Sequence, residues 1–109
     1  MDYELIDGKL YLKRAPAEKQ PILARLSRIE GQVRGLRQMV ENDRYCGEEL
    51  QQAAAITAAL REATLLILHD HLEAGIEHAS AVRASGQDGE TASVAVEEMI
   101  TLLRSALKQ

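Results

Sequence analysis

Residues 46–71, CGEELQQAAAITAALREATLLILHDH, read as most of one long helix that carries Cys46 at one end and His71 at the other. At a rise of roughly 1.5 Å per residue, the two side chains lie about 37 Å apart in one chain. They can therefore share a ligand only if a second chain supplies one of them. In an antiparallel helix pair that matches residue 46 with residue 71, the crossing point falls inside the small-residue run 53–59. The sequence therefore predicts a two-fold dimer with two Cys46/His71 sites.

Ordinary packing is the alternative explanation for each of these two residues. A single cysteine is commonly a small buried side chain, and a single histidine on an apolar helix face is often part of the core. The spacing alone leaves both interpretations open.

Helical periodicity continues on both sides of this stretch. The central helix is predicted from about 45 to about 82, and the break at 85–89 separates it from a third helix over about 90–107. A first helix that ends at Asn42-Asp43 is indicated by apolar residues spaced three and four apart: Ile22, Leu26, Ile29, Val33, Leu36 and Val40. The third helix has its own apolar side: Val96, Met99, Ile100, Leu103 and Leu107.

The predicted fold class is therefore all-α, with a three-helix protomer over residues 16–109 and a long central helix. Two shorter helices cannot cover so long a helix on every side, so oligomerisation is expected. Residues 1–15 are a separate N-terminal tail or small hairpin, because short apolar runs flank Asp7-Gly8. An isolated hairpin is marginally stable, which leaves a tail that orders on contact as an equal alternative.

Composition places the chain in a broad class. A length of 109 residues is that of one domain, and without Phe or Trp its core must be aliphatic. The single cysteine cannot form an intrachain disulfide, the start lacks the apolar stretch of a signal peptide, and no run is long enough to cross a bilayer. A cytoplasmic protein without a membrane partner is expected.

The charges are segregated along the chain, although the formal net charge is only −4. Residues 8–37 hold eight basic and two acidic side chains, for a balance of +6, whereas residues 45–109 hold four basic and ten acidic ones, for −6. A basic first helix is a suitable electrostatic footprint for a polyanion such as DNA. A solvated helix face with mixed charges is the alternative.

The sequence shows no sign of an enzyme. It has no glycine-rich phosphate loop, no paired carboxylates in an apolar context, and no third residue to orient a Cys/His nucleophilic pair. A metal-binding helical oligomer that does not bind DNA is another class to consider, and the +6 segment counts against it.

Three motifs in combination resemble the copper-sensing operon repressor family (CsoR-type), whose other branches sense nickel, cobalt, formaldehyde or persulfide. They are RLSRIEGQVRG at 25–35, Tyr45-Cys46, and HDHLE at 69–73. The resemblance covers about residues 17–108. It implies a three-helix protomer, an antiparallel dimer, and a disc-like tetramer made of two dimers. It also implies a repressor that binds double-stranded operator DNA and is released when an inducer occupies the Cys46/His71 site.

The same resemblance assigns roles to further residues. Arg25 matches a DNA-contacting arginine of the family, and the basic position of its second helix falls at or beside Arg61. Lys19 and Arg28 are added to the DNA-binding set from their charge and helix face alone. Tyr45 and Glu98 stand where family members form a hydrogen-bond network around the histidine.

The inducer is left open by a departure from the family at Gly75, four residues after the histidine. Copper sensors have a cysteine there, and nickel and cobalt sensors have a histidine. One interpretation is that Cys46 and His71 hold Cu(I) alone or with an exogenous thiol, since Cu(I) accepts few, soft ligands; another transition metal is a variant of this interpretation. The alternative is an electrophile sensor of the formaldehyde type, without a cofactor, in which Cys46 is bridged to an amine such as Lys13.

Overall fold

The computed structural model describes residues 1–86 and 89–108, with the side chains of 89–92 excepted. The elements in chain order are β1 (Asp2–Ile6), β2 (Lys9–Lys13), α1 (Pro16–Glu41), α2 (Cys46–Ala84) and α3 (Gly89–Leu107). The prediction of three helices with a long central one is therefore confirmed. The predicted break at 85–89 coincides with the α2–α3 connection, of which residues 87–88 lie outside the described range.

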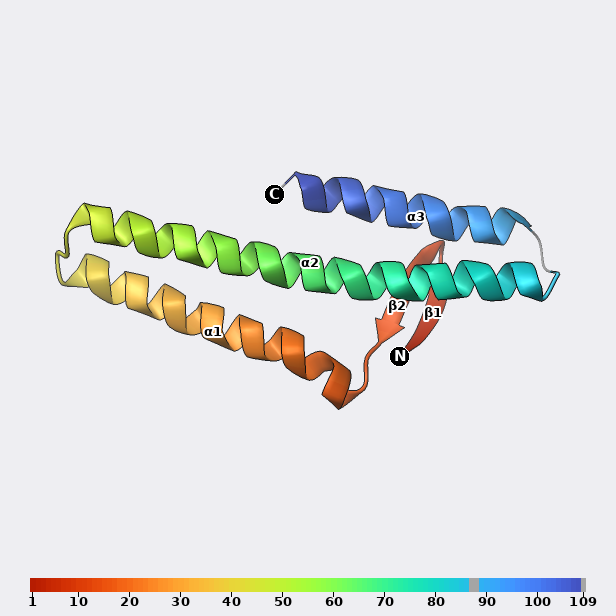
Figure 1. Ribbon diagram of the computed structural model, residues 1–109, viewed down its shortest axis with the longest axis horizontal. Coiled ribbons are helices and arrows are strands. Elements are labelled where there is room, and N and C mark those ends of the chain that lie inside the picture. The colour runs from red at the N-terminus through yellow and green to blue at the C-terminus, as the bar shows by residue number, and fades with distance from the viewer. Residues whose placement is uncertain (87–88, 109) are drawn as a thin grey trace.

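The long helix α2 is the spine of the molecule (Figure 1). α1 runs back along the N-terminal half of α2, and α3 runs back along its C-terminal half. β2 contacts both α2 and α3. The result is elongated, with extents of 63 × 29 × 18 Å and a radius of gyration of 18.7 Å. A compact domain of this length has a radius of gyration of about 13 Å, so one chain leaves much of its helix surface uncovered.

Local sequence accounts for the bounds of α1. Pro16 occupies its first turn, where the missing N–H is not needed. The backbone N–H of Ala15 donates to the Glu18 carboxylate at 2.9 Å, and this hydrogen bond is the main reason why the pKa of Glu18 is lowered. At the other end Asn42 caps the helix, and Asp43 adopts a positive φ of 54° that turns the chain toward α2.

The N-terminal residues form a hairpin of β1 and β2, one of the two conformations predicted for them. Asp7 and Gly8 have consecutive positive φ angles of 52° and 75°, as a tight two-residue turn between antiparallel strands requires. The hairpin is not isolated, because Leu10 is buried and the ring edge of Tyr3 rests on the His78 ring with the centroids 5.4 Å apart. Docking on α2 and α3 thus supplies the stability that a free hairpin lacks.

The core of one chain is small. In the described part of the chain no large side chain is fully buried, and half of the buried apolar residues are alanines. Several large apolar side chains of α2 remain exposed instead: Leu50, Leu60, Leu65, Ile67 and Ile76. None of the helices described combines the length and hydropathy needed to cross a bilayer. Exposed apolar surface of this kind is typical of interaction sites.

Candidate metal centre and DNA-binding surface

The structure brings together two of the predicted site residues, His71 of α2 and Glu98 of α3. Nε2 of His71 lies 2.5 Å from Oε1 of Glu98, and both side chains are 12% exposed. The other carboxylate oxygen, Oε2, accepts a hydrogen bond from the backbone N–H of Leu10 in β2. Glu98 therefore joins three elements, α2, α3 and the hairpin, at one histidine.

These contacts determine which ring nitrogen of His71 is available to a metal. Because a carboxylate only accepts hydrogen bonds, Nε2 of His71 must carry the proton in this contact. The neutral ring then presents its lone pair at Nδ1. Nδ1 has no hydrogen-bond partner among the described residues. A histidine oriented by a carboxylate through one nitrogen, with the other free, is the usual arrangement of a metal ligand.

The His71 ring is not sealed off by its neighbours. It lines a cavity of about 330 Å³ between the hairpin and α3, together with Leu10 and Glu98. It also lines a second hollow of about 170 Å³ between α2 and α3. A ligand from outside the chain can therefore approach the ring.

Cys46 and Tyr45 lie at the far end of α2 and do not meet His71 within one chain. Tyr45 precedes the first residue of the helix and is 76% exposed, and the Cys46 thiol is free and exposed. Cys46 and His71, 25 positions apart, belong to one unbroken helix (Figure 1), which keeps the two side chains about 37 Å apart. The buried-packing alternative for the cysteine is therefore wrong in the single chain.

One turn beyond His71, the missing side chain of Gly75 is replaced by a neighbour. A Cβ atom built on Gly75 would lie 2.5 Å from Sδ of Met99 and 3.0 Å from its Cγ. Met99 follows Glu98 directly in α3, so the same turn of α3 approaches His71 and covers Gly75. In the sequence Met99 is recognisable only as one apolar residue of a helix.

The amine considered for an electrophile sensor, Lys13, is engaged elsewhere. Its Nζ lies 3.1 Å from Oε2 of Glu4 on the exposed face of the hairpin. The next residue, Arg14, donates from Nε to Asp70 of α2 at 2.9 Å, and both of these side chains are largely buried. The second ion pair was not predicted, because its partners are 56 residues apart.

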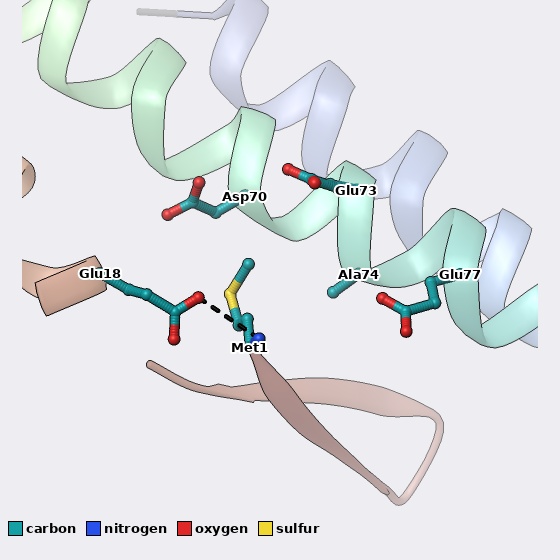
Figure 2. Close-up of a pocket in the computed structure, with 6 residues that line it drawn as sticks. All are labelled: Met1, Glu18, Asp70, Glu73, Ala74 and Glu77. Carbon is teal, nitrogen blue, oxygen red and sulfur yellow. Dashed lines mark ion pairs between the residues drawn. The ribbon is translucent and has the colours of Figure 1, made fainter. Parts of the chain in front are cut away.

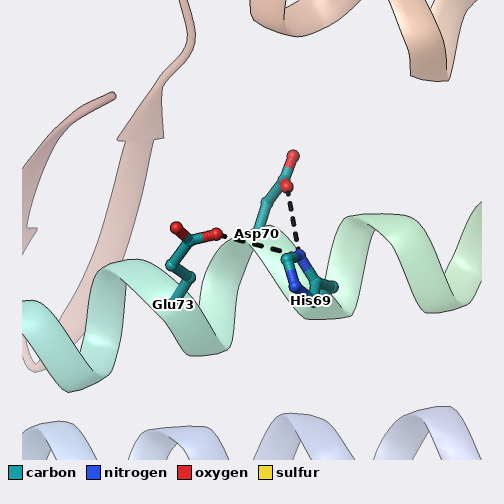
Figure 3. Close-up of side chains that lie close together, drawn as sticks. All are labelled: His69, Asp70 and Glu73. Carbon is teal, nitrogen blue, oxygen red and sulfur yellow. Dashed lines mark ion pairs between the residues drawn. The ribbon is translucent and has the colours of Figure 1, made fainter.

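Acidic groups gather on another side of α2. Figure 2 shows a pocket of about 280 Å³ in which the Met1 amine lies 3.4 Å from Glu18. The helix residues around it are Asp70, Glu73, Ala74 and Glu77. His69 contacts both Asp70 and Glu73 (Figure 3), and one ligand atom of each of the three residues lies within 4.8 Å of the others. His69 and Glu73 are exposed, Asp70 is held by an arginine, and none of the group joins His71.

The predicted DNA-binding residues are on the surface. Lys19, Arg25 and Arg28 of α1 are exposed and form no ion pair with any described residue. Arg37, by contrast, is paired with Glu41 at 2.9 Å. Arg61 of α2 is also exposed, but it lies beside the end of α3 rather than among the α1 residues. One chain therefore groups three of the four predicted residues on one helix.

Comparison with known proteins identifies the architecture. The family model described as metal-sensitive transcriptional repressor matches residues 18–105. This chain belongs to the metal-sensitive transcriptional repressors. It is accordingly a repressor and not an enzyme, and the resemblance to the copper-sensing operon repressors is confirmed.

Curated relatives of the repressor agree with this assignment. The copper-sensing transcriptional repressor CsoR of Bacillus subtilis is 40% identical over 95 residues, which cover 87% of each chain. The copper-sensing transcriptional repressor RicR of Mycobacterium tuberculosis is 43% identical over 75 residues, 69% of this chain and 78% of the relative.

Solved structures resemble the repressor over most of its length. The copper-sensing repressor CsoR with Cu(I) from Geobacillus thermodenitrificans has a TM-score of 0.69 at 33% identity, covering 86% of this chain and 91% of the other. The nickel-responsive transcriptional regulator InrS has a TM-score of 0.60 at 33% identity, covering 84% and 97%. Neither the electrophile-sensing alternative nor the class without DNA binding is favoured by these relatives. The roles of Cys46, His71, Tyr45 and the basic residues remain predictions.

Proposed function

We propose that this repressor senses Cu(I) at a site shared by two chains, with Cys46 from one and His71 from the other. It would release double-stranded operator DNA in the cytoplasm when that site is filled. The observation that carries the proposal is the double contact of Glu98, which leaves Nδ1 of His71 without a hydrogen-bond partner in a ring that lines a cavity. The named relatives that sense copper support Cu(I) over nickel.

The donor set suits Cu(I). A thiolate is a soft ligand and an imidazole an intermediate one, and Cu(I) accepts low coordination numbers. Cys46 lies exposed in the first turn of α2, where its sulfur is accessible to a ligand shared with a second chain. When bound, the metal supplies a bond between two chains that are otherwise held by packing alone.

The exposed surface of α2 supports the antiparallel dimer. α3 covers only the C-terminal half of α2 (Figure 1), so the small-residue run 53–59 has no α3 against it. Large apolar side chains flank this run on both sides, with Leu50 70% and Leu60 48% exposed. A second α2 packed across the run buries this surface and brings each Cys46 toward the partner's end of α2 that carries the histidine. Exposed Val33 and Val40 of α1 leave further apolar surface for the pairing of two dimers into a tetramer.

Glu98 supplies the coupling between the site and the rest of the protein. A metal held at Nδ1 would strengthen the hydrogen bond that Nε2 of His71 donates to Glu98. Since Glu98 also accepts from the Leu10 N–H, the change reaches α3 and the hairpin together. We propose that the altered packing of α3 on α2 moves the basic residues of α1 and Arg61 out of register with the operator. Such coupling is reciprocal, so DNA-bound repressor must bind Cu(I) more weakly.

Mixed oligomers test the shared site directly. One chain would carry Cys46→Ala and the other His71→Gln, with different affinity tags, so that only mixed species are purified. We expect neither variant alone to bind Cu(I) with the parent affinity, because each lacks one ligand in every site. The mixed dimer regains one complete site, formed by Cys46 of one chain and His71 of the other.

The measurement is an anaerobic Cu(I) titration against a competing chelator, with operator release followed by fluorescence anisotropy. A mixed dimer that binds Cu(I) no better than the two single variants would exclude the shared site. Gln is chosen because its amide can still donate to Glu98, which keeps the surrounding contacts in place.

A further inference from the structure

Met99 holds the space next to His71 that α2 leaves empty at Gly75. The methionine reaches from α3 and places its sulfur 2.5 Å from the point where a side chain of residue 75 would begin. Met99 is half-buried and Gly75 is buried, so this contact lies inside the α2–α3 seam. At this point of the seam α2 contributes only the backbone of Gly75.

The position is within reach of a metal held by His71. Residues four apart on a helix are neighbours on one face, with Cβ atoms about 5–6 Å apart. His71 and Gly75 have this spacing, and the Met99 sulfur lies 2.5 Å from the point where the Cβ of residue 75 would be. The thioether therefore lies beside the point from which a ligand of residue 75 would project, although it comes from a different helix.

We propose that Met99 is a third Cu(I) ligand of this repressor, completing the site with His71 of its own chain and Cys46 of the partner subunit. This inference rests on the proposed function. A thioether is a soft ligand that favours Cu(I) and contributes little to Zn(II) or Ni(II) binding. The methionine thus makes the site selective as well as tighter.

The assignment also gives α3 two attachments to the filled site. Glu98 holds His71 through Nε2, and Met99, the next residue, would bind the metal itself. Ligand binding then tightens α3 on α2 through adjacent residues of one turn. Methionine is suited to this part because its unbranched chain adjusts to the geometry of the metal.

The test compares Cu(I) affinities by anaerobic chelator competition for the parent protein, Met99→Leu and the control Ile100→Leu. Leu has nearly the volume of Met, so the fold is retained while the sulfur is removed. We expect Met99→Leu to lower Cu(I) affinity by about tenfold or more and Ile100→Leu to leave it unchanged. The affinity for Zn(II) is expected to be the same in all three proteins.

Repeating the Met99→Leu comparison in a second variant, Gly75→Cys, distinguishes a metal ligand at Met99 from a residue that acts only through packing. In Gly75→Cys the new thiol supplies the ligand from α2, so adding Met99→Leu should cost no more than about twofold. An equal loss of Cu(I) affinity in both backgrounds would show that Met99 acts only through packing. Copper X-ray absorption on selenomethionine-labelled protein gives an independent readout, with a selenium neighbour expected in the parent and absent in Met99→Leu.

The outcomes distinguish the two proposals. If the parent binds Cu(I), Cys46→Ala abolishes binding and Met99→Leu has no effect, the shared site stands and the third ligand is wrong. If the parent binds no Cu(I), the proposed function and this inference both fail. A selenium neighbour to copper together with a selective loss of Cu(I) affinity supports the third ligand.

Discussion

The two ends of α2 differ in how much of the sensing site one chain completes. In the C-terminal half His71 is 12% exposed, hydrogen-bonded to Glu98, and covered by α3 and the hairpin. At the N-terminal end Tyr45 is 76% exposed and Cys46 has an exposed, unpaired thiol. In the proposed shared site, the chain therefore builds the histidine half by its own folding, and the cysteine half would be used by a second chain. An inducer that joined the two halves would report on quaternary structure.

The largest effects are expected for substitutions of Cys46 and His71. Both should weaken Cu(I) binding, but only one should change the stability of the fold. Cys46→Ala and His71→Ala should each lower Cu(I) affinity by more than about 100-fold, beyond what loss of an outer hydrogen-bond partner costs. Only His71→Ala should also lower the free energy of unfolding, by about 1–3 kcal/mol, because Glu98 loses a donor in a partly buried place. Urea unfolding at a fixed protein concentration measures the second effect. Equal stability losses in both variants would contradict the comparison.

Glu98→Gln tests whether the histidine end is held by the carboxylate. Two N–H groups, from Leu10 and His71, share its two oxygens, and an amide offers a single acceptor. One donor is then left unpaired, and Cu(I) affinity should fall about 10–100-fold. Glu97→Gln is the matched control, since Glu97 is the exposed neighbour in the same helix. Chelator competition is the measurement, and similar affinities for the two variants would remove Glu98 from the site.

Lys13 and Arg14, at the end of β2, test which contacts attach the hairpin to α2. Arg14→Gln leaves the partly buried Asp70 without its partner and should cost about 1–3 kcal/mol in the free energy of unfolding. Lys13→Gln breaks an exposed ion pair with Glu4 and should cost less than about 1 kcal/mol. Both are read from urea unfolding curves. A larger loss for Lys13→Gln would mean that the hairpin is held differently.

The smallest effect is expected for the exposed basic residues of α1, which lie away from both Cys46 and His71. Arg25→Gln removes one exposed charge of α1, so operator affinity should fall a few-fold and the slope of log affinity against log salt by about 1. Cu(I) affinity of the free protein should not change. Arg37→Gln is the control, because Arg37 is already paired with Glu41 in α1. Fluorescence anisotropy over a range of salt concentrations decides the point, and an unchanged slope for Arg25→Gln would place the DNA surface elsewhere.

The sequence by itself determined the elements and predicted that a shared Cys46/His71 site would require a second chain. Helical periodicity, the Asp7-Gly8 turn and the spacing of Cys46 and His71 are local or linear properties, which chain geometry converts directly into three helices, a hairpin and a distance. Resemblance to the family added Glu98 beside the histidine, and the structure places it there.

Only the tertiary structure decided how the histidine end is closed. The Leu10 N–H on Glu98 joins residues 88 apart, Arg14 on Asp70 joins residues 56 apart, and Met99 enters the space of Gly75 from another helix. No local pattern encodes such contacts, because they depend on the rotation and depth at which α3 and the hairpin pack against α2. That packing places the Glu98 carboxylate against His71 and the Met99 thioether against Gly75, one turn further along α2, in the half of the proposed site that lies within one chain.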